Sequence, residues 1–384
     1  MWRSLASNLF NVLIVALFVG AGLVAWGQRQ YTGNGPLETP ICLRVEPGSN
    51  MRRVSRELAD KGAISNPSIF RVGADYSGKA DQLKAGSFLV PEATSMESIV
   101  DIVTRGGAST CGTEVLYRVG VTSQRIEVRE LDPATNRFTT LDEFDPVEEE
   151  AVAAYGDVRE EPDTRYRIAI AEGVTSWQIV QALNAAEFLN GTVEEIPAEG
   201  VLAPDSYEVP AGTDPADILD DMAVRQEQRL DEAWVQRVDG LPIETKEDAL
   251  ILASIIEKET GVPEERRTVA SVFVNRLRQG MRLQTDPTVI YGVTRGRGSL
   301  GRGIRQSELR DDNPWNTYVI DGLPATPIAN PGLASIEAAL DPEDTPLLFF
   351  VADGTGGHAF AETLAEHNEN VARWREIEAE RANQ

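Results

Sequence analysis

Two carboxylates at the end of an apolar stretch are the residues of this chain best suited to acid–base chemistry. Glu257 and Glu259 follow a run, residues 249–256, that leaves almost no polar face. At about 100° per residue, Glu259 continues the apolar stripe of that run, whereas Glu257 continues a more polar flank. A carboxyl group beside apolar side chains favours its protonated form, as a general acid near neutral pH requires. The alternative interpretation is an ordinary acidic helix end.

The apolar run is predicted to be a buried helix between Thr245 and Thr260. Thr245 followed by Asp248 has the form of a capping box, in which two side chains accept hydrogen bonds from the first turn. Gly261 and Pro263 form a stop signal. Because so little of its surface is polar, the helix is expected to lie inside its domain.

A second helix is predicted over residues 263–279, ended by Gly280. Residues 281–292 follow it, and they are dense in hydrogen-bonding side chains flanked by apolar ones. This segment is predicted to be an extended run. The pair Asp286-Pro287 within it is typical of a turn.

These segments closely resemble the endolytic murein transglycosylases, the YceG-like family. The motifs that carry the resemblance are Ala253–Thr260, Val269–Arg278, Gly280–Gly292, Asn316–Tyr318, Gly322–Pro324 and Phe350–His358. The resemblance is strong over about residues 240–370 and looser from the N-terminal apolar segment onward. It implies an α+β protein with a single N-terminal transmembrane helix, a LysM-like α/β module and a lysozyme-like α+β catalytic domain.

The resemblance also implies a reaction with one acid. In lytic transglycosylases the C6 hydroxyl of N-acetylmuramic acid attacks C1, which leaves a 1,6-anhydro end, and one glutamate both gives and takes the proton. Glu259 is expected to be that residue, with Glu257 as the alternative. Further side chains expected to line the cleft, unless they serve a turn or the core, are Gln284, Thr285, Asp286, Tyr291, Asn316 and Tyr318.

Two other functions stay open at this point. A hydrolytic muramidase would use Asp286 as a second carboxylate, because glycoside hydrolases normally need two. A non-catalytic glycan-binding scaffold of the cell-wall synthesis machinery would retain the lysozyme-like helix only as part of its fold and would not cleave glycan. The expected partners are peptidoglycan glycan strands, the cytoplasmic membrane and peptidoglycan synthases.

Charge narrows the range of ligands. The 384-residue chain has 42% hydrophobic residues and a net charge of −25, which argues against nucleic acid. Residues 261–310 nevertheless hold ten arginines against four acids, a local balance of +6. This basic island fits a ligand with carboxylates, such as the lactyl and peptide groups of cell-wall glycan, unless its arginines pair with acids elsewhere. The only histidines, His358 and His367, form no metal-ligand pattern, so no metal and no cofactor are expected.

The N-terminus predicts a membrane anchor. Residues 9–27 are long and apolar enough to span a bilayer, after a short tail of residues 1–8 that contains Arg3. A cleavable signal peptide is the rival interpretation. The positive N-terminus favours a cytoplasmic tail and an extracytoplasmic remainder. The protein is therefore expected in the inner (cytoplasmic) membrane as a single-pass protein.

An internal repeat organises the chain before the predicted helix pair. Two stretches, one within residues 28–110 and one that opens residues 166–384, each read as strand, helices, strand and helix. In both, a capping residue, Asn50 or Thr175, opens the helix that follows the first strand. By resemblance the first stretch is the LysM-like module, which binds glycan or serves as a spacer.

The remaining boundaries follow from these assignments. Residues 111–165 are expected to form an acidic, β-rich insertion or linker. Residues 166–384 form the expected catalytic domain, with its core at 245–370. Cys42 and Cys111 flank the first repeat, and outside the cytoplasm such a pair can form a disulfide; two buried thiols are the alternative.

Overall fold

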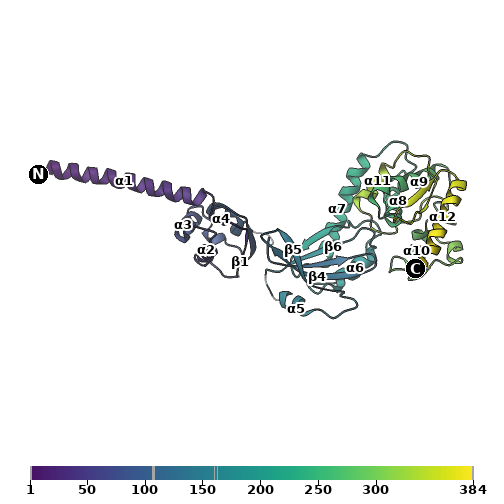
Figure 1. Cartoon of the computed structure of the whole chain (residues 1–384), viewed down its shortest axis with the longest axis horizontal. Helices are drawn as coiled ribbons and strands as arrows, with labels where there is room; N and C mark the ends of the chain where they lie inside the picture. Colours follow the sequence, from purple (N-terminus) through teal and green to yellow (C-terminus); the bar gives the residue numbers. More distant parts are fainter. Residues whose placement is uncertain (1, 106–108, 160, 162, 383–384) are drawn as a thin grey trace. The chain divides into compact units, whose positions relative to one another are not determined.

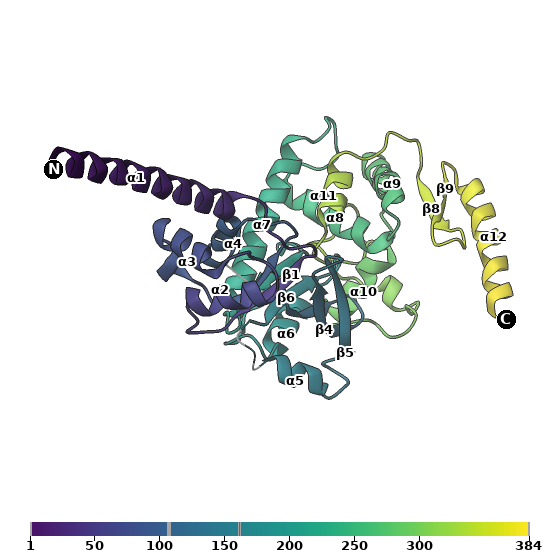
Figure 2. The ribbon, with the colours of Figure 1, turned by 60° about the vertical axis from the view of Figure 1, so that its left-hand side comes forward.

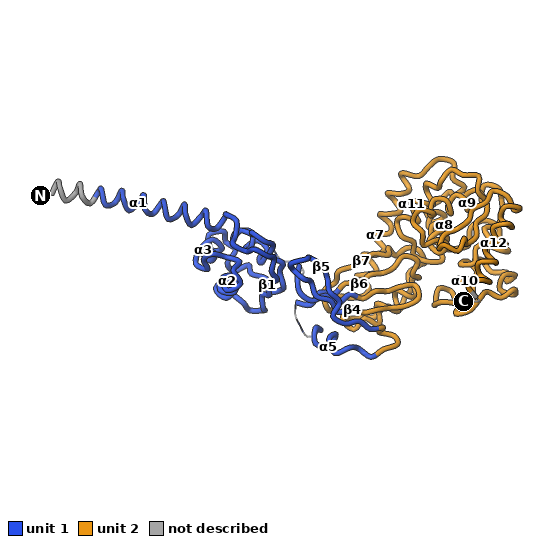
Figure 3. The backbone as a smooth tube through the Cα atoms, viewed as in Figure 1, with its two compact units in different colours: residues 1–116, 127–144, 150–166 blue, residues 117–126, 145–149, 167–384 orange. Residues whose placement is uncertain are grey.

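The computed structural model describes residues 2–105, 109–159, 161 and 163–382, with side chains from residue 10 onward. The fold is mixed α+β, as predicted. The chain divides into two compact units, coloured separately in Figure 3. Unit 1 comprises residues 1–116, 127–144 and 150–166, and unit 2 comprises residues 117–126, 145–149 and 167–384.

The chain begins with one long helix, α1 (Trp2–Thr32), the rod at the N-terminus in Figure 1. Its stretch Phe10–Thr32 has a mean hydropathy of 2.1 and is long and apolar enough to cross a membrane. Among the described helices no other meets that criterion. The predicted tail, residues 1–8, lies outside the residues whose side chains are described.

Unit 1 contains a small α/β module after α1. Its elements are β1 (Ile41–Val45), α2 (Met51–Asp60), α3 (Pro67–Tyr76), η1 (Ala80–Gln82), β2 (Gly86–Val90) and α4 (Met96–Thr104). β1 pairs antiparallel with β2, so that Ile41 lies opposite Val90. The predicted cap is confirmed, because the Asn50 side chain accepts a hydrogen bond from the third residue of α2. Leu43, Leu58 and Phe70 are fully buried in the core of this module.

A disulfide joins Cys42 in β1 to Cys111, with their Cα atoms 5.8 Å apart. The bond encloses the whole α/β module, because the two residues are 69 positions apart in the chain.

Five strands form the second sheet. They are β3 (Thr113–Val119), β4 (Gln124–Asp132), β5 (Arg137–Phe144), β6 (Arg165–Ile170) and β7 (Ser206–Val209), in the order β5-β4-β3-β6-β7. A short helix, α5 (Ala153–Arg159), lies between β5 and β6 in the sequence. The segment predicted to be β-rich thus holds three complete strands.

The second copy of the repeat leads into the helical part of unit 2. β6 is followed by α6 (Ser176–Ala185), β7 and α7 (Pro215–Val235). The prediction of more than one helix between the two strands is wrong for this copy, because residues 186–205 form turns and loop. Thr175 caps α6 as predicted, and Gln178 completes a capping box.

The helical core of unit 2 is built around α8 (Lys246–Glu259). The predicted capping box of Thr245 and Asp248 is present, and residues 249–256 are all buried. α11 (Leu333–Leu340) runs beside α8 in both Figure 1 and Figure 2. The other elements are η2 (Pro263–Glu265), α9 (Arg266–Arg278), α10 (Asp286–Thr294), η3 (Glu308–Arg310), β8 (Phe349–Ala352), β9 (His358–Ala361) and α12 (Leu364–Ala382). β8 and β9 pair antiparallel.

The prediction of an extended run over residues 281–292 is wrong for its second half. Residues 281–285 form no helix, with a left-handed turn at Gln284, and α10 then runs from Asp286 to Thr294. Pro287 does not end a helix here, because a proline in the first turn has no backbone N–H to lose and its φ already suits the helix. The Asp286-Pro287 pair therefore opens a helix and is not a turn.

We expect the disulfide to stabilise the α/β module substantially. Closing a loop of this length in the unfolded chain is worth about 4 kcal/mol by chain entropy. A Cys42→Ser/Cys111→Ser double variant should therefore melt well below the wild type in a thermal scan. Adding reductant to the wild type should reproduce the variant's melting temperature. Equal melting temperatures of oxidised wild type and variant, or two alkylatable thiols in the denatured, unreduced protein, would contradict the expectation.

Candidate active site

Glu259 is the last residue of α8, and its carboxyl group meets the segment that precedes α10. Its Oε1 accepts a hydrogen bond from the Thr285 hydroxyl. Burial raises the pKa of Glu259 above the ordinary carboxyl value, and the negative charge of Asp286 raises it further. The Thr285 hydrogen bond and the electrostatic interactions with His358 and Arg276 act in the opposite direction. Since burial is the largest contribution, Glu259 holds a proton at a higher pH than a solvated carboxyl group.

Thr285 is aimed at Glu259 by a network of hydroxyl groups. Its side chain is buried, and its backbone N–H donates to Thr317 Oγ1 over 3.1 Å. Thr317 Oγ1 lies 2.9 Å from Thr288 Oγ1. The preceding residue, Gln284, has φ at +52°, a left-handed conformation that costs energy for a residue other than glycine. This turn lets two neighbouring residues point apart: Gln284 is exposed while Thr285 faces inward.

A second carboxylate lies close to Glu259. Asp286 is the first residue of α10, and its Oδ1 accepts a 2.6 Å hydrogen bond from the Tyr318 hydroxyl. Burial raises the pKa of Tyr318, as does its bond to Asp286, so the phenol keeps its proton and acts as a donor. Asp286 is exposed and electrostatically coupled to Glu259.

The nearby cations are held by other groups. The Arg276 side chain, buried on α9, donates through Nε to the Leu348 carbonyl and through a terminal nitrogen to the Leu283 carbonyl, each over 2.7 Å. His358 Nδ1 lies 2.7 Å from Glu265 Oε2. In the part of the chain that the structure describes, no ion pair joins Glu259 to a cation. The carboxyl group is therefore not locked into its charged form.

Glu257 has a different environment. Its Oε2 accepts a 3.0 Å hydrogen bond from the Gly332 N–H and a 2.7 Å bond from the Ser335 hydroxyl. Gly332 is the N-cap position of α11 and has no side chain to cap that helix. The Glu257 carboxylate takes over this role, and its charge also suits the positive end of the helix dipole.

Two of the predicted cleft residues lie elsewhere. Asn316 is fully buried and donates to the carbonyls of Glu308 and Asp311 while accepting from the Tyr318 N–H, so it organises a loop. Tyr291 donates to Glu199 Oε2 over 3.1 Å and not to the Glu259 region. Of the predicted cleft residues, Thr285, Asp286 and Tyr318 interact with Glu259 in the structure.

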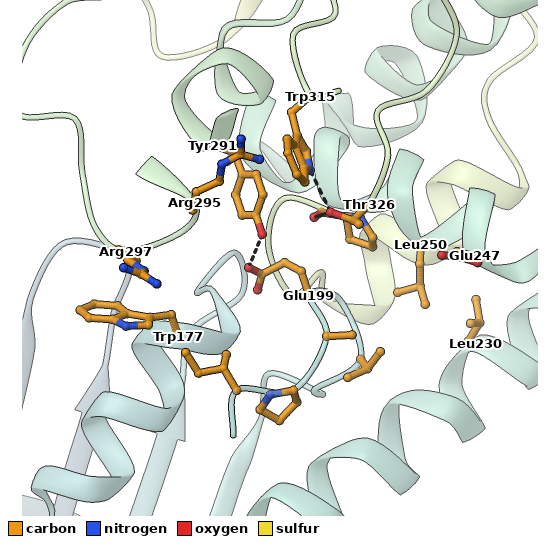
Figure 4. Close-up of a pocket in the computed structure, with 15 residues that line it drawn as sticks. Trp177, Glu199, Leu230, Glu247, Leu250, Tyr291, Arg295, Arg297, Trp315 and Thr326 are labelled. Atoms are coloured by element: carbon orange, nitrogen blue, oxygen red, sulfur yellow. Dashed lines mark hydrogen bonds between the residues drawn. The ribbon is translucent and has the colours of Figure 1, made fainter. Parts of the chain in front are cut away.

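A cavity of about 620 Å³, shown in Figure 4, lies beside α10, which contributes Tyr291 to its lining. Glu199 lies in its wall, where Oε1 accepts from the Ser176 N–H over 2.5 Å and Oε2 from Tyr291. Burial raises the pKa of Glu199. The sequence offered no signal for this acid, because Glu199 stands alone in a loop and its partners are distant in the chain. Arg276 and the Trp315 ring of the cavity were missed for the same reason.

The architecture and site define an α+β protein with a buried carboxyl group at the end of a core helix. The model of the YceG-like family matches residues 148–373, more than half of the chain, and the chain belongs to that family. An endolytic murein transglycosylase of Bacillus subtilis (strain 168) is 27% identical over 349 residues, which cover 86% of this chain and 84% of the relative. An endolytic murein transglycosylase of Streptococcus pneumoniae serotype 2 (strain D39) is 26% identical over 339 residues, covering 86% of this chain and 58% of the relative.

One solved structure is similar as well. The crystal structure of a yceG-like protein from Listeria monocytogenes is 27% identical, covers 86% of this chain and 98% of its own, and superposes with a TM-score of 0.45.

Substitutions of Asp286 and Thr285, which both act on the Glu259 carboxyl group, should shift the pKa of Glu259 in opposite directions. Asp286→Asn removes a negative charge that disfavours the carboxylate, so the pKa of Glu259 should fall. Thr285→Val removes a hydrogen bond to the carboxylate while keeping the side-chain shape, so the pKa should rise. NMR titration of ¹³C-labelled glutamate carboxyl carbons measures both. Shifts of the same sign in the two variants would refute this electrostatic description.

Glu259 should also make the protein less stable at alkaline pH. Its folded pKa lies above the ordinary value of 4.5, so the folded state holds the proton where the unfolded chain has released it. The contribution of this bound proton to the free energy of unfolding is complete below the pKa that Glu259 has in the unfolded chain. It is lost as pH rises through the pKa that Glu259 has in the folded protein. Glu259→Gln stays neutral, so its melting temperature should gain on the wild type as pH rises above 4.5 and through the folded pKa of Glu259.

The matched control is Glu257→Gln, two residues away on the same helix. That substitution weakens the cap of α11, so the variant should be less stable than the wild type. A melting-temperature difference for Glu259→Gln that does not change with pH would show that the carboxyl group is not desolvated.

Proposed function

We propose that the protein is a membrane-anchored endolytic lytic transglycosylase, a peptidoglycan lyase that cuts nascent glycan strands between N-acetylmuramic acid and N-acetylglucosamine. The observation that carries the proposal is the Glu259 carboxyl group, whose pKa is raised by burial and which has no ion-pair partner among the described residues. Two relatives that align with 86% of the chain are named endolytic murein transglycosylases.

Glu259 would serve as the acid and then as the base. The protonated carboxyl group gives its proton to the glycosidic oxygen as the C1–O bond breaks and oxocarbenium character develops at C1. The C6 hydroxyl of the same N-acetylmuramic acid attacks C1, and the Glu259 carboxylate takes the hydroxyl proton. The product is a 1,6-anhydro end, and Glu259 returns to its protonated form without water.

The groups around Glu259 fit these two half-steps. Before the reaction, burial and the charge of Asp286 keep the proton on the carboxyl group. After proton transfer, the Thr285 hydroxyl can donate to the new carboxylate, and Arg276 lies close enough to favour its charge. The exposed side chain of Gln284 and the Tyr318–Asp286 pair would orient sugar hydroxyl or N-acetyl groups.

The remaining parts of the chain would place this site close to the membrane. The apolar helix α1 would be a single-pass anchor in the cytoplasmic membrane, with the N-terminus in the cytoplasm and unit 2 outside. The α/β module of residues 28–110 would be a LysM-like element that binds glycan or holds the catalytic domain at a distance. The domain from residue 166 would be lysozyme-like. Cleavage close to the membrane would limit strand length and bring the protein near peptidoglycan synthases.

A hydrolytic muramidase is the second candidate, because Asp286 lies close enough to influence the pKa of Glu259. In that reaction a water molecule would replace the C6 hydroxyl, with Asp286 as the second carboxylate. The products distinguish the two reactions: transglycosylation leaves anhydro ends, and hydrolysis leaves ends heavier by one water.

Glu259→Gln should abolish strand cleavage by the full-length protein. Gln keeps the shape of the side chain but has no proton to transfer, so the rate should fall by roughly 10²–10⁴ or more. Glu257→Gln, which loses a helix cap, should cost about tenfold or less. Mass spectrometry of the digested strands measures both the rate and the type of end, and thermal melts check folding.

Three results would overturn parts of this proposal. Full activity of Glu259→Gln with an inactive, folded Glu257→Gln would exchange their roles. Hydrated ends from the wild type would make the protein a muramidase. Glycan binding without cleavage by any form would make it a scaffold of cell-wall synthesis.

A further inference from the structure

The cavity beside α10 combines aromatic walls with a basic rim. Its aromatic lining consists of Trp177, Tyr291 and Trp315, each half-buried. Trp315 is held in place by a 2.9 Å hydrogen bond from its ring N–H to the Thr326 hydroxyl. Two exposed arginines, Arg295 and Arg297, lie on the rim. Figure 4 shows the Tyr291 hydroxyl directed at Glu199, which also lines the cavity.

The turn that presents these arginines is firmly anchored. Gly296, between them, is buried, and its carbonyl accepts a 2.6 Å hydrogen bond from the Thr175 hydroxyl. A Cβ atom at this position would lie 3.1 Å from both Glu199 and the Tyr291 ring. The backbone is left-handed at Arg295, with φ at +55°. Gly296 thus packs against the cavity wall. The side chains of Arg295 and Arg297, on either side of it, stay exposed at the cavity rim.

Arg295 and Arg297 also have no acid partner among the described residues, unlike four other arginines of the basic island. Four arginines of residues 261–310 do form ion pairs, namely Arg266 with Glu172, Arg267 with Asp341, Arg282 with Asp321 and Arg302 with Glu308. The Arg295 guanidinium lies over the Trp315 ring, 3.9 Å from its centre. Among the described residues neither Arg295 nor Arg297 is in an ion pair, so both can bind an external carboxylate.

Three segments contribute both to the cavity and to the surroundings of Glu259. They are α8 with Leu250 and Glu259, α10 with Tyr291 and Asp286, and the loop of residues 313–318 with Trp315 and Tyr318. Leu250 and Glu259 are nine residues apart on one helix, about 13 Å along its axis. A substrate held at Glu259 can therefore reach the cavity with a side branch only a few residues long.

We infer that this cavity binds the peptide that branches from the glycan strand, with its carboxylates on Arg295 and Arg297 and its apolar side chains against the aromatic and aliphatic walls. The exposed Glu247 lines the cavity on the opposite side of Figure 4 from Arg297 and can receive an ammonium group of the same peptide. The inference rests on the proposed function, because it assigns a second part of that substrate to a site of its own.

The test compares two substrates with the full-length protein. One is uncrosslinked glycan strands that carry their peptides, and the other is the same strands after an amidase has removed the peptides. The Arg295→Gln/Arg297→Gln variant should lose about tenfold or more in kcat/KM on peptide-bearing strands, mainly through KM, and nothing on bare strands. The wild type should prefer peptide-bearing strands by a similar factor.

Arg237→Gln is the matched control. Arg237 is exposed and stacks on Trp234 at 4.2 Å in the same unit, but it does not line the cavity. This variant should cleave both substrates as the wild type does. A loss on both substrates in the double variant, or on neither, would overturn the assignment of the cavity.

Binding of the free peptide separates failure of this inference from failure of the proposed function. Calorimetry with the released peptide should show binding to the wild type and to Glu259→Gln, and about tenfold weaker binding to the double arginine variant. Absence of peptide binding in an enzyme that cleaves glycan would refute the inference alone. Binding with no cleavage of either substrate would refute the lytic activity and leave the cavity assignment standing.

Discussion

A carboxyl group buried at the end of an apolar helix is the constraint on which the rest of unit 2 depends. Desolvation disfavours the charged form of Glu259, and no salt bridge among the described residues offsets it. Such a group costs folding free energy above its pKa, so the surrounding core must be stable without it. The buried face of α8 and its packing against α11 supply that stability.

The three charged residues at the end of α8 show how one helix can serve three purposes. Glu257 caps α11, and Lys258 donates to the Gly173 carbonyl over 3.2 Å at the start of the second repeat. Burial lowers the pKa of Lys258. Glu259 is left to meet Thr285. Because Glu257 and Lys258 fix neighbouring segments to the helix end, they hold its last turn in place and so determine where Glu259 points.

Local patterns predicted the elements of the site, and distant contacts decided its composition. The capping box of Thr245 and the apolar run made α8 predictable, because both signals lie within the helix itself. The start of α10 was not predictable in this way, since the Asp286-Pro287 pair is equally common in turns and in first helical turns. Glu199 was missed because its environment comes from Ser176, 23 residues away, and Tyr291, 92 residues away.

Opposing contributions to the pKa of one carboxyl group reflect what acid–base catalysis demands of it. A group that gives and then takes a proton must not be held too strongly in either state, so its pKa has to lie near the working pH. A direct ion pair with Arg276 would favour the carboxylate and prevent proton donation. Arg276 instead donates its hydrogen bonds to the Leu283 and Leu348 carbonyls. Its charge lowers the pKa of Glu259 less than burial raises it. Burial then outweighs the charge, and a single carboxyl group can act in both directions.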